Sequence, residues 1–213
     1  MVRLVTADAP DVVALQEVPL WAVRRLESWS GMASAWAMTM PALLGPLARR
    51  ATDLDPQRFR SSFTGQANAL LVNPHFEAGR HRRLVLNPGL SRGEWLLRGG
   101  QRRVCQALEV EARGERLVLA NLHASNSPDR RLVGEEIERA AGFLAEAASC
   151  VLCGDFNVAG HPVPGFTAPI DGIDQVLVRG VSFERGPEPW PEERRRFDGH
   201  VLSDHAPVEA VVA

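Results

Sequence analysis

Short apolar runs recur along this chain of 213 residues, and five polar segments lie where such runs begin or end. Apolar runs of this length, bounded by turn residues, are typical of buried β-strands. Any one polar segment is explained equally well by a turn or by an exposed strand end. Five of them in one chain are not explained that way, so together they form a candidate site. They are Leu-Gln-Glu at 15–17, Asn-Leu-His at 121–123, Gly-Asp-Phe-Asn at 154–157, Ile-Asp at 173–174 and Ser-Asp-His-Ala-Pro at 203–207.

The side chains that these segments offer are carboxylates, amides and two histidines without cysteine partners. Asp155 and Asn157 are two residues apart, so on an extended chain they point to the same side. A set rich in oxygen donors suits a hard cation such as Mg²⁺ or Mn²⁺ rather than a structural zinc ion. Two members have a simpler interpretation as well, His123 as a hydrogen-bonded core histidine and Asp204 as a turn residue.

Strands outnumber helices in the secondary structure that the pattern predicts. The strands at 103–111 and 117–122 are separated by a turn at Gly114, which predicts a hairpin. Hairpins together with strands that flank helices favour an α/β fold with mixed sheets over a doubly wound parallel sheet. The other strands are predicted at 11–18, 68–72, 84–86, 149–154, 173–178 and 206–212.

Two helices are predicted from apolar spacing and from end signals. Within residues 19–30, Val23, Leu26 and Trp29 recur at helical spacing after a proline. The clearer helix is predicted to begin at Ser127, with the serine as N-cap and the following proline in the first helical position.

Composition places the chain among ordinary globular proteins, with 45% hydrophobic and 23% charged residues. We expect one domain over residues 1–213 and no membrane span, because no apolar run approaches the length that a span requires. The three cysteines are an odd, sparse set, and the N-terminus lacks the apolar segment of a signal peptide. Both features favour a reducing, cytoplasmic location. The tryptophans at 21, 29 and 36, with Met38 and Met40, could line a lipid-binding or base-stacking surface, but we expect them to pack in the core instead.

The net charge of −2 gives no sign of a broad nucleic-acid-binding surface, although arginines can still gather locally. All 24 basic residues are arginine, a bias that a GC-rich genome explains. Most arginine clusters, such as those at 80–83, 102–103 and 194–196, are therefore expected to be solvated faces. Arg130 and Arg131 follow the His123 segment and are the best placed to contact a substrate phosphate.

The five polar segments together resemble the endonuclease/exonuclease/phosphatase superfamily. It includes pancreatic-type deoxyribonucleases, apurinic/apyrimidinic endonucleases, inositol polyphosphate 5-phosphatases, neutral sphingomyelinases and poly(A) deadenylases. The resemblance runs from about Asp11 to the C-terminus, and Gly-Asp-Phe-Asn followed by Ser-Asp-His is its most specific part. It implies a four-layer α/β sandwich of two packed mixed β-sheets flanked by helices. Family members usually begin with a strand that ends in asparagine, so the resemblance also implies either a start further upstream or the loss of that strand here.

The resemblance implies a role for each catalytic candidate. Asp155 and Asn157 match the pair that orients or activates the attacking water and steadies the scissile phosphate. His205 matches the essential histidine, and Asp174 matches the carboxylate that fixes its tautomer and charge. His123 matches a second histidine, which contacts a phosphate oxygen. The general base is either Asp155 or a histidine, and the sequence leaves both open.

The resemblance also implies a divalent cation, Mg²⁺ or Mn²⁺, held by Glu17 with Asp204 as a second acidic residue near it. Since a phosphodiester anion repels hydroxide, such a site must neutralise charge and position a water. The implied function is metal-dependent hydrolysis of a phosphoester, in the manner of a phosphodiesterase or nuclease, with nucleic acid among the candidate substrates. The short connection between residues 157 and 174 argues against loops that enter duplex grooves. Two alternatives stay open: a small-molecule or lipid-headgroup phosphatase of the same fold, and a catalytically impaired member that acts as a binding protein. The sequence predicts no oligomeric state.

Overall fold

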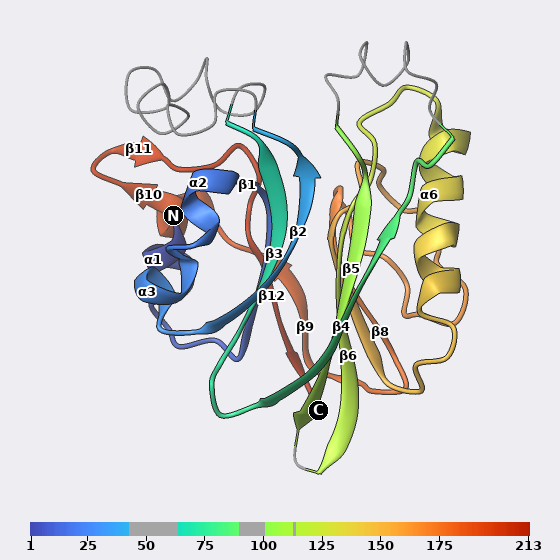
Figure 1. The fold of residues 1–213 in the computed structure, drawn as a ribbon, viewed down its shortest axis with the longest axis horizontal. Coiled ribbons are helices and arrows are strands. Elements are labelled where there is room, and N and C mark those ends of the chain that lie inside the picture. The colour runs from blue at the N-terminus through green and yellow to red at the C-terminus, as the bar shows by residue number, and fades with distance from the viewer. Residues whose placement is uncertain (43–63, 90–100, 113) are drawn as a thin grey trace.

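The computed structural model describes residues 1–42, 64–89, 101–112 and 114–213 of the chain. Figure 1 shows two β-sheets packed face to face, with helices against the outer side of each. The larger sheet contains both parallel and antiparallel neighbours. The predicted fold class, an α/β sandwich of packed sheets flanked by helices, is confirmed.

The smaller of these two sheets is antiparallel, with the strand order β1-β3-β2. Its strands are β1 (Val12–Pro19), β2 (Ala33–Met40) and β3 (Gln66–Val72). Three short helices lie on its outer side in Figure 1: α1 (Val2–Val5), α2 (Leu20–Val23) and α3 (Leu26–Ser30). Residues 19–30, predicted as one helix, thus form two helical turns in succession. The strand β2 was not predicted, because its alanine-rich sequence carries a weak β signal.

The larger sheet has the order β4-β5-β6-β7-β8, and only β6 and β7 are parallel to each other. Its strands are β4 (Glu77–Val85), β5 (Val104–Ala112), β6 (Glu115–His123), β7 (Cys150–Asp155) and β8 (Asp174–Arg179). The parallel pair needs a crossover, which the helix α6 (Arg130–Phe143) supplies on the outer face of this sheet (Figure 1).

The start of α6 differs in detail from the prediction. Asp129, and not Ser127, is the N-cap residue, because its carboxylate accepts hydrogen bonds from the backbone N–H groups of Arg131 and Leu132 at 3.1 and 3.3 Å. Ser127 instead accepts a hydrogen bond from the backbone N–H of Asp129 at 3.2 Å. A serine and an aspartate two residues apart compete for the cap, and the sequence alone does not rank them.

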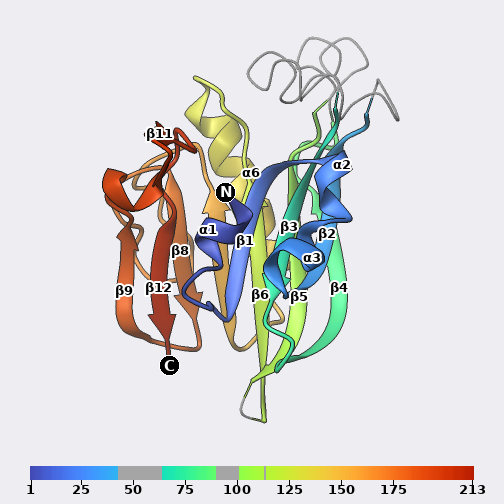
Figure 2. The same ribbon diagram turned by 90° about the vertical axis from the view of Figure 1, so that its left-hand side faces the viewer.

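The C-terminal part of the chain adds two small antiparallel pairs. They are β9 (Phe183–Pro189) with β12 (Val208–Val212), and β10 (Arg196–Phe197) with β11 (His200–Val201), preceded by a 3₁₀ helix at Glu192–Arg195. Figure 2 shows the β9–β12 pair beside β8. Over the described ranges, β1 pairs with β3 alone and β12 with β9 alone, so each keeps one strand edge without a ladder partner there. The loss of a first strand stays a prediction.

Apolar residues fill all three spaces between the layers. Ile137 of α6 and its C-cap residue Leu144 pack against Leu122 and Leu152 of the larger sheet. Leu26 belongs to a second cluster between the short helices and the smaller sheet. The third cluster lies between the two sheets and contains Leu70, Val72, Leu108, Val110 and Leu119.

A polar contact also joins the two sheets close to the candidate site. The Asn121 amide of β6 donates hydrogen bonds to the carbonyl oxygens of Leu15 and Ala69, at 3.0 and 2.9 Å. Its own oxygen accepts a hydrogen bond from Gln16 at 2.7 Å. Asn121 is fully buried, so its amide would be costly to leave unpaired. Asn121 therefore fixes β6 against β1 and β3.

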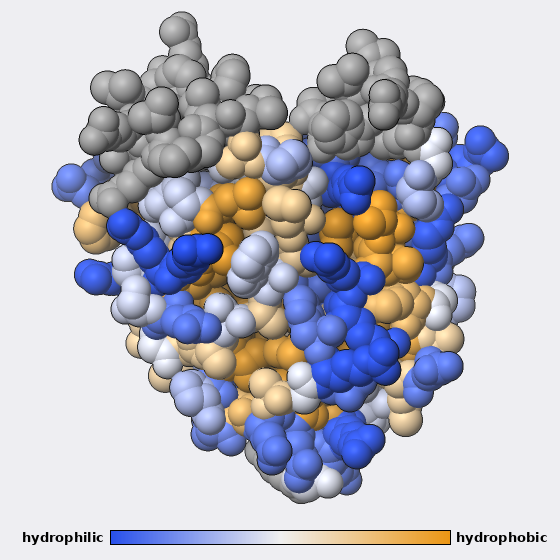
Figure 3. Space-filling view, in the orientation of Figure 1, coloured by the Kyte–Doolittle hydropathy of each residue, from blue (hydrophilic) through white to orange (hydrophobic). Residues whose placement is uncertain are grey.

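The expectation that the tryptophans at 21, 29 and 36 and the methionines at 38 and 40 all pack in the core is wrong for two of them. Trp36 and Met38 are 44% and 45% exposed, because β2 is an edge strand and both side chains lie on its outward face. Trp21 and Trp29 do pack together, edge to face, with ring centres 6.2 Å apart. Figure 3 shows hydrophobic side chains interspersed with hydrophilic ones over this view of the molecule. Within the described residues, no helix is long and apolar enough to cross a membrane.

Candidate active site

Strand register places three predicted site residues in one row at the end of the larger sheet. His123 ends β6 and lies opposite Asp155, which ends β7. Asp155 in turn lies opposite Asp174, which begins β8. Gly154 permits this close pairing, because a Cβ atom there would lie 1.9 Å from the carbonyl oxygen of Leu122, and its φ of +133° is one that side chains rarely adopt. The row thus spans 51 positions of the sequence, and its direct neighbours are up to 32 positions apart.

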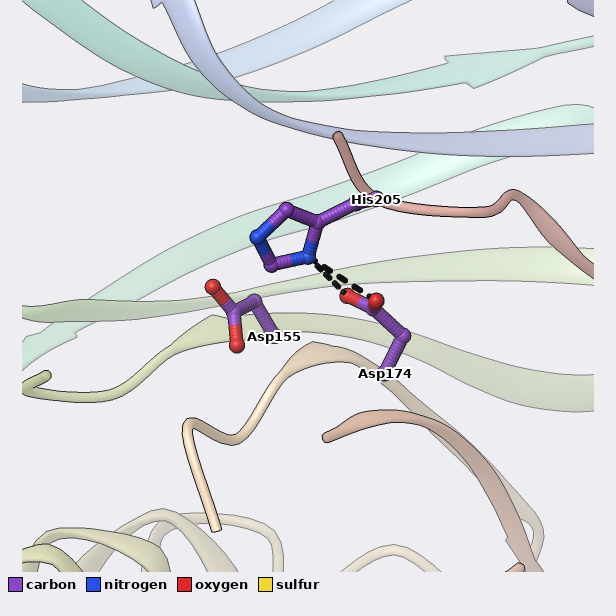
Figure 4. A group of neighbouring side chains, drawn as sticks. All are labelled: Asp155, Asp174 and His205. Atoms are coloured by element: carbon purple, nitrogen blue, oxygen red, sulfur yellow. Dashed lines mark hydrogen bonds and ion pairs between the residues drawn. The ribbon is translucent and has the colours of Figure 1, made fainter. Parts of the chain in front are cut away.

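His205 completes the row from the segment that precedes β12. Its Nδ1 atom lies 2.9 and 3.1 Å from the two carboxylate oxygens of Asp174, and the Asp155 carboxylate lies beside the ring (Figure 4). A ligand atom from each of Asp155, Asp174 and His205 lies within 4.8 Å of the others. An imidazole flanked by two carboxylates has its positive form stabilised.

The charge state of this group follows from burial and from its neighbours. Burial lowers the pKa of His205, but the carboxylates of Asp174, Asp155 and Asp204 outweigh it, and the net shift is upward. Burial raises the pKa of Asp174, and the charge and hydrogen bond of His205 oppose that rise. Both effects keep a proton within the pair, so we assign the shared proton to the imidazole and the negative charge to the carboxylate.

Asn157 holds the Asp155 carboxylate in place. The backbone N–H of Asn157 donates to Asp155 Oδ1 at 2.9 Å, and its side-chain amide donates to Oδ2 at 3.1 Å. The same amide donates to the carbonyl oxygen of Ala124 at 3.0 Å, which ties the loop after β7 to the loop after β6. Asn157 has a φ of +51°, a left-handed conformation that asparagine tolerates better than most residues. Burial raises the pKa of Asp155 to about 6, although the Asn157 N–H opposes the rise.

His123 is almost fully buried and faces an arginine. Nη1 of Arg103 lies 2.7 Å from His123 Nε2, and Asp155 Oδ2 lies 3.6 Å from the same nitrogen. A guanidinium can only donate, so Nε2 must accept and the ring proton must be on Nδ1. Burial, then the charges of Arg103 and His205, lower the pKa of His123 to about 3. The imidazole is therefore neutral at neutral pH.

The contact of Arg103 with His123 was not predicted from the sequence, which placed Arg103 with Arg102 on a solvated face. A signal was available in the predicted hairpin. Val104 of β5 pairs with His123 of β6, so the residue just before Val104 must lie near the end of β6. The hairpin register therefore indicates which arginine reaches the site.

The two predicted metal ligands, Glu17 and Asp204, have different surroundings. Glu17 is exposed, has a φ of +55°, and lies at an irregularity of β1 between Leu15 and Val18. It is not a member of the group formed by Asp155, Asp174 and His205. Asp204 is exposed and, with Asp174 and His205, lines a cavity of about 260 Å³.

The predicted phosphate contacts Arg130 and Arg131 are the first two residues of α6 and point into solvent. The side chain of Arg131 is 83% exposed and forms an ion pair of 3.4 Å with Glu135, one turn further along the helix. Arg130 is also exposed. Neither residue lines the two cavities at the site.

Residues 1–205 match the sequence model of the Endonuclease/Exonuclease/phosphatase family. The chain belongs to this family. Members of this family hydrolyse phosphoester bonds, and this chain is therefore a phosphoester hydrolase. A search of curated protein sequences gave no significant match.

Solved structures with the same fold extend over nearly the whole chain. A functionally unknown conserved protein from Enterococcus faecalis is 16% identical, with a TM-score of 0.72 over 99% of this chain and 88% of that one. A humanized D. rerio TDP2 is 14% identical, with a TM-score of 0.68 over 100% of this chain and 90% of that one. ANGEL2, a 2′,3′-cyclic phosphatase, is 15% identical, with a TM-score of 0.54 over 74% of this chain and 43% of that one. At these identities the likeness shows the fold.

Proposed function

We propose that this member of the family is a divalent-metal-dependent phosphodiesterase that acts on nucleic acid or a nucleotide-like diester. The observation that carries the proposal is the His205–Asp174 pair, hydrogen-bonded at 2.9 Å, with the Asp155 carboxylate beside the ring. This arrangement supplies a positive imidazole and a separate carboxylate within one small site. Both are needed when water attacks an anionic phosphate.

The donor set at the site fits a hard divalent cation. Two carboxylates and an imidazole have ligand atoms within 4.8 Å of one another, in a space bordered by Asp204. Oxygen donors suit Mg²⁺ and Mn²⁺. We assign Glu17 and Asp204, the two residues that the family resemblance implies, as the residues that hold it at the border of this group. When bound, the cation polarises the phosphate and offsets its charge.

The protein's own residues then divide the remaining work. Asp155, fixed by Asn157, orients the attacking water and accepts its proton, and a pKa of about 6 suits a base near neutral pH. His205 holds a proton next to the phosphate and delivers it towards the leaving oxygen, while Asp174 fixes the ring through Nδ1. His123 stays neutral and, together with the Arg103 guanidinium, faces the phosphate oxygens.

Two further observations support the finer assignment. A D. rerio TDP2 with the same fold has been solved with a single-strand DNA product, at 14% identity and a TM-score of 0.67. The connection between β7 and β8 is short here, which favours a flexible single strand or a small diester over a duplex. All three cysteines are free, which agrees with the predicted cytoplasmic location.

The test is hydrolysis of bis(p-nitrophenyl) phosphate and of single-stranded DNA with Mg²⁺ or Mn²⁺, and with a chelator. We expect turnover with either metal, none with the chelator, and loss by a factor of about a thousand or more in His205→Ala, since acid and electrostatic contributions are both removed. His75→Ala is the matched control, because His75 also pairs with an aspartate, Asp11, at 3.2 Å but on the exposed surface. Metal-independent turnover, or equal losses in both variants, contradicts the proposal.

A further inference from the structure

The short hairpin β10–β11 carries the most exposed large hydrophobic side chain of the described residues. Phe197 is 68% exposed, and His200, which is also exposed, is its direct cross-strand partner. Residues directly opposite each other in an antiparallel pair lie on the same face, so the two rings project from one side of the hairpin. We call these two residues the aromatic face. Single exposed hydrophobic residues are common on protein surfaces, so the case for a function depends on how this face is held and where it lies.

The turn of the hairpin holds the aromatic face in one shape. Asp198 and Gly199 connect the two strands with φ values of +50° and +75°. Positive φ at both central residues is typical of a type I′ turn, whose twist matches that of paired strands. The Arg196 guanidinium also donates to the carbonyl oxygen of Gly199 at 3.1 Å and forms an ion pair with Glu192. Phe197 is therefore presented on a defined support, which lowers the entropic cost of binding against it.

The base of the hairpin is fixed to the turn that carries the catalytic imidazole. The backbone N–H of Leu202 donates to the carbonyl oxygen of Arg195 at 3.2 Å, and the Arg195 guanidinium donates to that of Ser203 at 3.0 Å. The Ser203 hydroxyl accepts a hydrogen bond from the backbone N–H of His205 at 3.2 Å. Since five residues of chain reach at most about 18 Å, the Cα atoms of His200 and His205 lie within that distance. Figure 2 shows the hairpin at the same end of the molecule as the start of β12, which His205 precedes.

The charged residues around the hairpin do not make it a phosphate-binding surface. The Arg194 guanidinium lies over the Trp190 ring, 3.7 Å from the ring centre. It also pairs with Asp8 and Glu209 at 2.6 and 2.7 Å. Residues 192–201 hold three arginines and three acidic residues, so their charges cancel. What the hairpin offers to a ligand is therefore an exposed ring rather than a charge.

We propose that Phe197 stacks on a base of a single-stranded nucleic acid, a few nucleotides from the phosphate that is hydrolysed. This inference rests on the proposed function and narrows its substrate class from diesters in general to strands longer than one nucleotide. Every base has a flat face, so stacking on an aromatic ring tolerates any sequence. The bases of a duplex already stack on their neighbours, and the ring therefore suits a single strand.

The test compares two oligonucleotides that differ only in their bases. They are a short oligothymidylate and a strand of the same length in which abasic tetrahydrofuran residues replace every nucleoside outside the cleaved linkage, assayed at fixed free Mg²⁺. We expect kcat/KM to be higher by about tenfold for the strand with bases, the size expected for one base stacked on one ring. A general loss of activity affects both strands equally, so the ratio reports on contacts with the bases.

Variants assign that ratio to the aromatic face. Phe197→Ala should lower it by about tenfold, and Phe197→Trp should retain it, because a larger ring still stacks. Val201→Ala is the matched control, because Val201 lies on the opposite face of the same hairpin and is 39% exposed. It should leave the ratio unchanged. A ratio that Phe197→Ala leaves unchanged, or that both alanine variants lower equally, overturns the proposal.

Salt concentration separates stacking from phosphate contacts. Added salt should weaken the binding of both strands, because counterions compete for the phosphates. The ratio between the strands should stay the same, because stacking on a neutral ring releases no counterions. A ratio that falls towards one with salt contradicts the proposal.

Binding measurements separate this inference from the proposed function. If neither strand is hydrolysed, the proposed function fails, but fluorescence anisotropy should still show tighter binding of the labelled oligothymidylate than of the labelled abasic strand. Phe197→Ala should remove this difference. If the strands are hydrolysed but bind with equal affinity, the proposed function stands and the stacking role is overturned, which leaves a protein or a lipid as the partner of the exposed ring.

Discussion

The site contains two histidines that the surrounding protein holds in opposite charge states. His123 is 5% exposed and faces Arg103, and its pKa is lowered to about 3. His205 is more exposed and faces Asp174, and its pKa is raised despite partial burial. Histidine therefore acts as a neutral hydrogen-bonding group at one place and as a cation at the other, and burial together with the charges of the neighbours decides which.

Asp155 lies between the two histidines, and His205 acts on its charge. It is 3.6 Å from His123 Nε2, and the charge of His205 lowers its pKa while burial raises it more strongly. Burial and the charge of Asp174 thus bring the pKa of Asp155 to about 6, although the Asn157 N–H and the charge of His205 oppose the rise. Substitutions at the groups around each histidine test this comparison.

The largest effect should come from removing the carboxylate between the two histidines. In Asp155→Asn the side chain keeps its shape and its contact with the Asn157 N–H, but it cannot accept a proton from water. We expect kcat for a phosphodiester to fall by about a thousandfold or more. The measurement is steady-state kinetics with saturating metal. A loss of only severalfold would remove Asp155 from the catalytic role.

Asp174→Asn should have a smaller effect on rate and a diagnostic effect on pH dependence. Without the negative charge, the pKa of His205 falls, because Asp174 is the main group that raises it. We expect kcat to drop by about a hundredfold. The limb of the kcat profile that declines at high pH should also move to lower pH, since His205 loses its proton earlier. An unshifted limb would mean that a different group sets it.

The same Asp155→Asn variant should make the metal-free fold more stable. Because the pKa of Asp155 is raised from 3.8 to about 6 in the folded protein, its ionisation opposes folding. The stability that it contributes is present below about pH 4, is lost as pH rises through about 6, and is absent at pH 7. Asp155→Asn removes this penalty of up to about 3 kcal/mol at pH 7 but loses the hydrogen bond from the Asn157 side chain, worth about 1 kcal/mol. The Tm should therefore rise by a few degrees at pH 7 and fall slightly at pH 4. A lower Tm at pH 7 contradicts a penalty for the buried charge.

The smallest effect is expected for Glu136, which holds the loop that follows the neutral His123. Glu136→Gln keeps one acceptor for Ser125 but replaces the other oxygen with a donor, so one of the two bonds is lost. We expect about 1–2 kcal/mol less stability and a higher KM with little change in kcat, because the loop that follows His123 loosens. Glu138→Gln, an exposed position on the same helix, is the control. Equal behaviour of the two variants would remove Glu136 from this positioning role.

Much of the fold could be predicted from local sequence. The hairpin of β5 and β6 and the strands β1, β3 and β7 follow from apolar runs bounded by turn residues, and the structure confirms them. The extent of β4 and the existence of β2 and β9 did not follow, because charged or alanine-rich sequences become strands only when a neighbour pairs with them.

The candidate site likewise contains some residues that could be predicted from the sequence and some that could not. The residues brought together by strand ends, His123, Asp155 and Asp174, lie in motifs that the sequence displays. Arg103 lies in no motif, and its contact with His123 depends on hairpin register and on the rotamer of a long side chain. The charge states depend on burial and distance, which a linear pattern does not contain. The roles of Glu17, Asp204, Arg130 and Arg131 stay predictions.

The most direct test of the two charge states is a nitrogen-15 NMR titration of the histidine rings in the metal-free protein. His123→Gln and His205→Gln assign the two rings among the six histidines of the chain. His205 should titrate at a pH above its ordinary 6.5. His123 should keep a neutral ring, with the proton on Nδ1, down to the acid limit of the folded state. Two rings that titrate together near pH 6.5, or a doubly protonated His123 at neutral pH, would contradict the account.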